Sequence, residues 1–262
     1  YKGTTIGKME HLDAATLDEF LAFNKKYYVP NNATLVVAGD IDINQAKKMI
    51  ESYFGSIPRG EEIKRDFPQE DLITEPIKAT AYDPNIQIPA IMTAYRTPSM
   101  KTRDSRVLDM ISSYLSTGRS SVLYKKMVDD KKMALQVGAI NLSQEDYGTY
   151  ILYGLPQGEN KLEDLIKEID EEVVKIQTDL ISEKDYEKLQ NQFENNFVSS
   201  NSSVEGIASS LATYHVLFGD ANLINTEIDI YRSITREEMR EVAKKYLNPN
   251  QRLILEYLPE KK

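Results

Sequence analysis

The chain has 262 residues, which is enough for one large domain or for one complete domain with part of another. Its 41% hydrophobic and 28% charged residues are typical of a soluble globular protein, and no apolar run approaches the length of a membrane helix, which excludes membrane insertion. The formal net charge of -9 disfavours nucleic acid as a partner, and the absence of cysteine excludes disulfides and thiolate metal sites.

The first predicted elements are a helix, a strand and a second helix. Thr16 and Glu19 form a capping-box pattern, which predicts a helix over residues 16–28 that ends before Pro30. The apolar run that follows predicts a buried strand over residues 34–39, and a helix is predicted from Asn44 onward. The charged, Pro- and Gly-containing stretch that comes next is predicted to be a linker, residues 58–76.

The remainder, residues 77–262, is predicted to form one domain. Strands are expected at 77–82, 88–95, 133–141, 147–155 and 252–258. Helices are expected at 103–115, after the Gly118 break, and at 161–180, 183–199, 203–217 and 235–247. Clustered strands followed by clustered helices predict an α+β fold, with an antiparallel sheet covered by helices on one side.

An internal repeat bears on the domain organisation. The segment that begins at Thr16 resembles the segment that begins at Thr235, 219 positions later, and both contain a glutamate three residues on, then Lys-Lys-Tyr, a proline and an apolar run. A chance match of common helix and turn patterns is the alternative, but the shared capping box favours duplication. Since most of the first copy would then be missing, residues 1–57 are predicted to be the C-terminal tail of an upstream homologous domain.

Three segments resemble the pitrilysin/insulinase family of zinc metallopeptidases, to which the mitochondrial processing peptidases also belong. They are TIG at residues 5–7, KYYVPNNATLVVAGD at 26–40, and GRSSVLY at 118–124 followed by Met133. The second is the most specific of the three. The resemblance implies two homologous α+β halves that close around a peptide, and it identifies this chain with the C-terminal, non-catalytic half.

The resemblance also implies a zinc ion, bound in the other half by the two histidines of an H-x-x-E-H helix and a downstream glutamate. This chain has only His11 and His215, which do not form such a pair. Packed or surface histidines are the simpler interpretation of both. We therefore expect no metal and no cofactor in this chain, with zinc in the N-terminal half of an active parent.

Active relatives use an arginine, and a tyrosine seven residues later, to hold the substrate carbonyl, and alignment places Val128 and Leu135 at these two positions. The resemblance makes the following residues candidates for lining the substrate cleft: Gly118, Arg119, Ser120, Tyr124, Val128 and Leu135. A shifted alignment would bring Lys126 or Lys131 near the arginine position, and Tyr147 or Tyr150 would have to replace the phenol. No catalytic residue is predicted.

The predicted function is a non-catalytic domain of a zinc metallopeptidase that helps to enclose a peptide or an unfolded protein. An inert scaffold or partner subunit of the same family is the alternative. The expected partners are an upstream catalytic half or a homologous subunit, and self-association is expected if the apolar faces of residues 1–57 lack their own sheet. The compartment is not determined by the sequence, and the bacterial cell envelope or periplasm is only slightly favoured.

Overall fold

The computed structural model describes residues 3, 5–68 and 71–260. The chain forms two compact units: the first comprises Tyr1–Gln69 with Ser202–Ala221, and the second comprises Glu70–Asn201 with Asn222–Lys262. Among the described residues, no helix is long and apolar enough to cross a membrane. The division at 1–57, 58–76 and 77–262 that the sequence favours stays a prediction.

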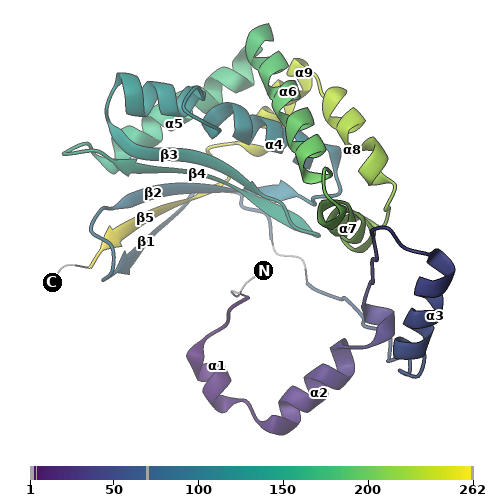
Figure 1. Cartoon of the computed structure of the whole chain (residues 1–262). Coiled ribbons are helices and arrows are strands. Elements are labelled where there is room, and N and C mark those ends of the chain that lie inside the picture. Colours follow the sequence, from purple (N-terminus) through teal and green to yellow (C-terminus); the bar gives the residue numbers. More distant parts are fainter. Residues whose placement is uncertain (1–2, 4, 69–70, 261–262) are drawn as a thin grey trace. The chain divides into compact units, whose positions relative to one another are not determined.

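The second unit contains one five-stranded sheet in the order β1-β5-β2-β4-β3 (Figure 1). Its strands are β1 (Ile77–Asp83), β2 (Ala90–Pro98), β3 (Ala134–Leu142), β4 (Tyr147–Pro156) and β5 (Arg252–Pro259). The β2–β4, β3–β4 and β2–β5 pairs are antiparallel as predicted, but β1 and β5 are parallel. The sheet is therefore mixed, because the closing strand enters between the first two strands.

Helices cover one face of this sheet, which confirms the predicted α+β fold (Figure 1). The helices of the second unit are α4 (Arg103–Ser116), α5 (Leu162–Thr178), α6 (Glu183–Ser200), α8 (Leu223–Arg232) and α9 (Arg236–Tyr246), of which α4, α5 and α9 contact the sheet. A π-helix, Tyr124–Asp130, follows the Gly118 break. Helix α8 is not among the predicted elements, although Leu223, Glu227 and Tyr231 recur at helical spacing.

The core lies between the sheet and the helices. Alternate residues of β4, Tyr150 and Leu152, are buried on the helix-covered side, as the period of two in a strand requires. The predicted apolar face of α4 is buried as well, with Leu108 and Ile111 completely inaccessible. Burying each such side chain contributes about 1.5–3 kcal/mol, so this core is the main stabilising feature of the second unit.

The first unit contains helices but no strand among its described residues. Its elements are α1 (Met9–Ala14), α2 (Leu17–Tyr27), a 3-10 turn (Pro30–Asn32), α3 (Ile43–Phe54), α7 (Val204–Thr213) and a π-helix (Tyr214–Phe218). The predicted strand 34–39 is wrong as an observed element: these residues lie outside any helix or strand, because the described chain supplies no backbone beside them to form a ladder. No described residue of the first unit is buried.

Both predicted capping boxes are present. The Glu19 amide donates to Thr16 Oγ1 at 3.4 Å and the Thr16 amide donates to Glu19 Oε2 at 2.8 Å. The corresponding distances between Glu238 and Thr235 at the start of α9 are 3.1 and 3.2 Å. The two halves of the sequence repeat therefore share their helix-start geometry, although one copy lies in each unit.

Candidate functional site

The predicted cleft residues begin at the turn after α4. Gly118 has a φ of +78°, which favours glycine, and its carbonyl accepts from the Ser121 hydroxyl at 2.7 Å. Lys188 of α6 donates to Ser120 Oγ at 2.7 Å, and Arg119 is exposed. The hydroxyl groups in this turn thus bind neighbouring protein groups and do not cap the following helix.

Val128 lies on the π-helix Tyr124–Asp130, as does the half-buried Tyr124. The π-helical geometry is shown by the Lys131 amide, which donates to the Lys126 carbonyl five residues earlier at 3.0 Å. Val128 is partly buried and packs against the hydrophobic core of the second unit. The residue aligned with the substrate-binding arginine thus contributes to packing.

Leu135 is the extra residue of a β-bulge at the start of β3, between Ala134 and Gln136, and its side chain is 49% exposed. Neither tyrosine considered as a replacement for the missing phenol is placed to act near Leu135. Tyr150 is completely buried on the helix-covered side of the sheet. Tyr147 lies at the other end of β4, about 27 Å away at 3.4 Å per residue, and its ring contacts Arg96.

Lys126 and Lys131, which a shifted alignment would bring near the arginine position, are both bound to α5. Lys126 Nζ lies 2.8 Å from Glu168, 3.0 Å from Glu171 and 2.8 Å from Glu172, and Lys131 also pairs with Glu168. Burial would lower the pKa of Lys126, but hydrogen bonds to the three glutamates outweigh this effect and raise it. These lysines therefore fasten the π-helix to α5.

Replacing Lys126 with methionine is expected to destabilise the second unit by about 1–3 kcal/mol, because Glu172, only 4% exposed, would lose one of its two cationic partners. Urea denaturation followed by circular dichroism measures this change. Lys125→Met is the matched control, since Lys125 is exposed on the same π-helix. Equal stabilities of the two variants would contradict a fastening role for Lys126.

The described residues do not fit a zinc site. His11 on α1 and His215 on the π-helix Tyr214–Phe218 are both exposed. Within the described part of the chain, no group of three or more His, Cys, Asp or Glu side chains is placed to hold a metal ion. The expectation that zinc binds in another half stays a prediction.

A buried polar network joins α4 to α8 and β3. It is not predicted from the sequence, because α8 is not among the predicted elements. Arg106 Nε and Nη2 donate to the two carboxylate oxygens of Glu227 at 2.6 and 2.8 Å. Asp109 accepts from Asn141 Nδ2 at 2.8 Å and from the Tyr231 hydroxyl at 3.0 Å. Burial raises the pKa of Asp109 to about 6, although the two hydrogen bonds oppose this shift.

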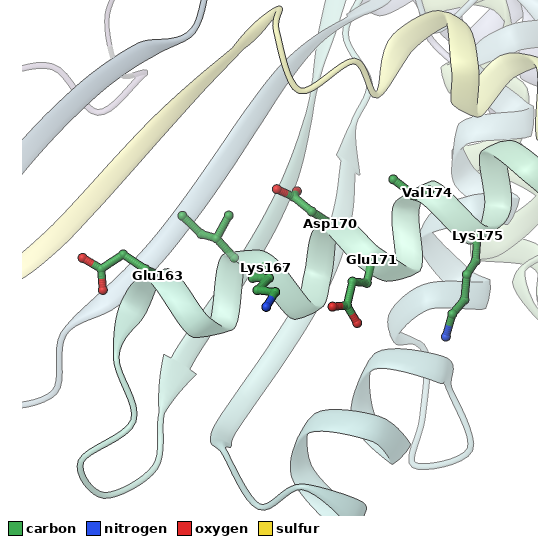
Figure 2. A pocket seen from close by; sticks show the side chains of 7 residues that line it. Glu163, Lys167, Asp170, Glu171, Val174 and Lys175 are labelled. Carbon is green, nitrogen blue, oxygen red and sulfur yellow. The ribbon is translucent and has the colours of Figure 1, made fainter.

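A hollow of about 620 Å³ follows α5 (Figure 2). Its lining residues are Glu163, Ile166, Lys167, Asp170, Glu171, Val174 and Lys175. All come from one helix, and Asp170 is already bound to Arg252 at 2.5 and 2.8 Å. None of the predicted cleft residues lines this hollow, which is an open surface along the helix.

The family described as the peptidase M16 inactive domain matches residues 14–193. The zinc protease PqqE of Helicobacter pylori is 27% identical over 218 residues, which cover 82% of this chain and 49% of PqqE. A protease structure from the same organism has a TM-score of 0.87 at 23% identity, covering 96% of this chain and 61% of that one. The first half of the periplasmic protease PqqL from Escherichia coli has a TM-score of 0.75 at 16% identity, covering 97% and 57%. The structural similarities show a shared fold, and the chain spans about half the length of the curated relatives it matches.

Proposed function

The chain belongs to the family of peptidase M16 inactive domains, and from this membership we propose that it is the non-catalytic half of a zinc-dependent peptidase and helps to enclose a peptide substrate. The family match over residues 14–193 carries the proposal.

The surface proposed to face the peptide is the side of the sheet opposite the helices (Figure 1). Apolar side chains remain accessible there: Ile77 on β1 is 48% exposed, and Ile140 and Leu142 on β3 are 41% and 45% exposed. Tyr153 lies on the same face, and its hydroxyl accepts from Gln136 at 3.0 Å. Apolar and tyrosine side chains together suit an extended peptide or an unfolded protein better than a charged ligand.

The proposed partner is a zinc-binding half, either in the same polypeptide or in a homologous subunit. The length of the relatives, about twice that of this chain, supports a two-half protein. A second copy of this chain is a further candidate partner. A periplasmic location is proposed as well, supported by the resemblance to PqqL, whose description places that protein in the periplasm.

An inert scaffold of the same family is the second candidate function. Val128 favours it, because a residue that packs against the core leaves the neighbouring surface without a cation for substrate. The two functions differ in what happens when a catalytic half binds. A non-catalytic half increases peptide cleavage by its partner, whereas a scaffold binds without changing the cleavage rate.

Zinc content and peptide cleavage test the proposal. The purified chain is expected to contain far less than one zinc ion per molecule and to leave a quenched-fluorescent peptide library uncleaved. Addition of a zinc-binding M16 half is then expected to increase cleavage over that half alone. Stoichiometric zinc with cleavage by the chain alone would contradict the proposal, and binding without a rate increase would favour the scaffold.

A further inference from the structure

One margin of the five-stranded sheet is formed by β1, and no described strand pairs with its outer edge (Figure 1). The side chains of β1 are accessible as well: residues 77–80 are exposed, and Tyr82 is 62% exposed. An outer edge of this kind presents a row of backbone donors and acceptors on which another strand can form.

The pairing of β1 with β5 determines which backbone groups point outward. The carbonyl of Asp83 accepts from the Glu260 amide beyond the end of β5 at 3.2 Å, so the backbone of Asp83 faces β5. The amide and the carbonyl of one residue point to the same edge of a strand, and successive residues alternate between the two edges. The odd-numbered residues of β1 therefore bond β5, whereas the amides and carbonyls of Lys78, Thr80 and Tyr82 point away from the sheet.

These outward groups are complementary to themselves when two copies of β1 run antiparallel about Thr80. Thr80 then lies opposite Thr80 of the second copy, and Lys78 of each copy lies opposite Tyr82 of the other. Directly opposite residues of antiparallel strands can exchange both of their backbone hydrogen bonds. In this register, each outward amide and carbonyl of the three residues has a partner in the other copy.

The side chains favour the same register. Lys78 and Tyr82 lie on one face of β1, so each ammonium group would lie beside a phenol ring of the other copy. Opposite residues that exchange hydrogen bonds have Cα atoms about 5.5 Å apart, which brings such a pair within reach of a cation–π contact. Threonine pairs are also favourable across antiparallel strands.

Two prolines that bound β1 disfavour the neighbouring registers. Pro76 precedes the strand and Pro84 follows it, and neither has an amide hydrogen. Moving the centre of symmetry to residue 79 places Pro76 opposite Tyr82, and moving it to residue 81 places Pro84 opposite Lys78. Each shift therefore loses hydrogen bonds that pairing about Thr80 retains.

We propose that the outer edge of β1 is the contact surface for a second copy of this chain, and that the two copies pair antiparallel about Thr80 to form one continuous sheet. Lysines on edge strands commonly prevent such pairing, but Lys78 lies here opposite an aromatic ring and not opposite a second cation. The contact is smaller than a standard interface, so the dimer forms reversibly as the concentration rises. Because an edge contact covers neither face of the sheet, it does not depend on the proposed function.

Residue-resolved amide exchange, measured by NMR spectroscopy on the full chain, tests the proposal. In dilute solution, the amides of Ala79 and Ala81 are expected to be protected by β5, while those of Lys78, Thr80 and Tyr82 exchange freely. As the concentration rises and sedimentation velocity shows a dimer, exchange at the three outward amides is expected to slow at least about 10-fold.

Variants of the central pair separate the backbone contact from the side chain. Thr80→Pro removes an outward amide but none that bonds β5, and it is expected to raise the dissociation constant of the dimer at least about 10-fold, because both hydrogen bonds of the central pair are lost. Thr80→Val is the matched control, since it keeps both the amide and the preference for a strand. Circular dichroism of each variant verifies that it is folded.

A charge reversal tests the register. Tyr82→Lys places a second ammonium group opposite Lys78 and is expected to abolish the dimer. The double variant Lys78→Glu/Tyr82→Lys gives opposite pairs of opposite charge and is expected to restore it. If the double variant stayed monomeric, pairing about Thr80 would be wrong.

Three further outcomes would overturn the inference. They are a monomer at every concentration, a dimer whose three outward amides still exchange freely, and a dimer that Thr80→Pro leaves intact. Protection of these amides only after an extended chain is added, with reduced and carboxymethylated α-lactalbumin as the probe, would also overturn it, because a peptide would then be the occupant.

Discussion

Replacing Glu227 with alanine is expected to lower the free energy of unfolding of the second unit by about 3–5 kcal/mol. The Arg106 and Glu227 side chains are only 7% and 10% exposed, and they form two hydrogen bonds to each other. Removing the carboxylate takes away both hydrogen bonds from Glu227 and leaves the guanidinium with the carbonyls of Lys101 and Thr102, both at 3.2 Å. A buried cation that has lost its carboxylate is costly because the protein interior replaces its hydration poorly.

Urea denaturation monitored by far-ultraviolet circular dichroism measures this loss of stability. An unchanged slope of the free energy of unfolding against urea concentration would show that the folded and unfolded states keep their compactness. Asp229→Ala is the matched control on the same helix, since Asp229 is 70% exposed and lies 3.6 Å from Arg232. It should cost less than about 1 kcal/mol.

The double variant Arg106→Met/Glu227→Leu separates the cost of leaving the Arg106 charge unpaired from the other causes of the lost stability. If the unpaired charge dominates, an apolar pair of similar size should restore most of the stability. A Glu227→Ala loss below about 1 kcal/mol would contradict the view that this pair fastens α8 to α4.

The elements of the fold that the sequence predicts are those that depend on residues close together in the chain. The capping boxes at Thr16 and Thr235 and the alternation along β4 depend on residues a few positions apart, and the structure has both. The parallel β1–β5 pair was not predictable in this way, because the choice of neighbour for a closing strand depends on the whole sheet. Arg106 and Glu227, 121 residues apart, carry no local pattern that pairs them.

The segment 34–39 illustrates a different limit. Its apolar β-branched residues favour a strand, yet a strand exists only where another backbone accepts its hydrogen bonds. The corresponding segment of the repeat forms β5 in the second unit, where β1 and β2 lie on either side. The candidate site shows a similar limit. Alignment identifies the positions of Leu135 and Val128, but it does not reveal that Leu135 lies on a β-bulge or that Val128 packs against the core.

The free energy of unfolding of the Asp109→Asn variant, relative to that of the natural chain, is expected to increase by about 2–3 kcal/mol as the pH rises from 4 to 7. Asp109 has a pKa of about 6 in the folded protein against an ordinary value of 3.8, so between these values the folded state binds more protons than the unfolded state. Protonation of Asp109 therefore stabilises the fold at low pH, and this contribution is lost as the pH rises through 6.

The charged and titratable groups around Asp109 are Arg106, which opposes the shift, and Glu227, Tyr231 and Tyr150, the last of which is completely buried. Carboxylates such as Glu168 and Glu172 have lowered pKa values, so their protonation destabilises the fold on acidification. The informative quantity is therefore the difference in the free energy of unfolding between the variant and the natural chain at each pH. Urea denaturation at a series of pH values gives this difference, and Asp129→Asn on the exposed side of the π-helix controls for the loss of one acidic side chain. A difference in stability that stays constant from pH 4 to 7 would show that burial does not raise the pKa of Asp109 in the folded protein.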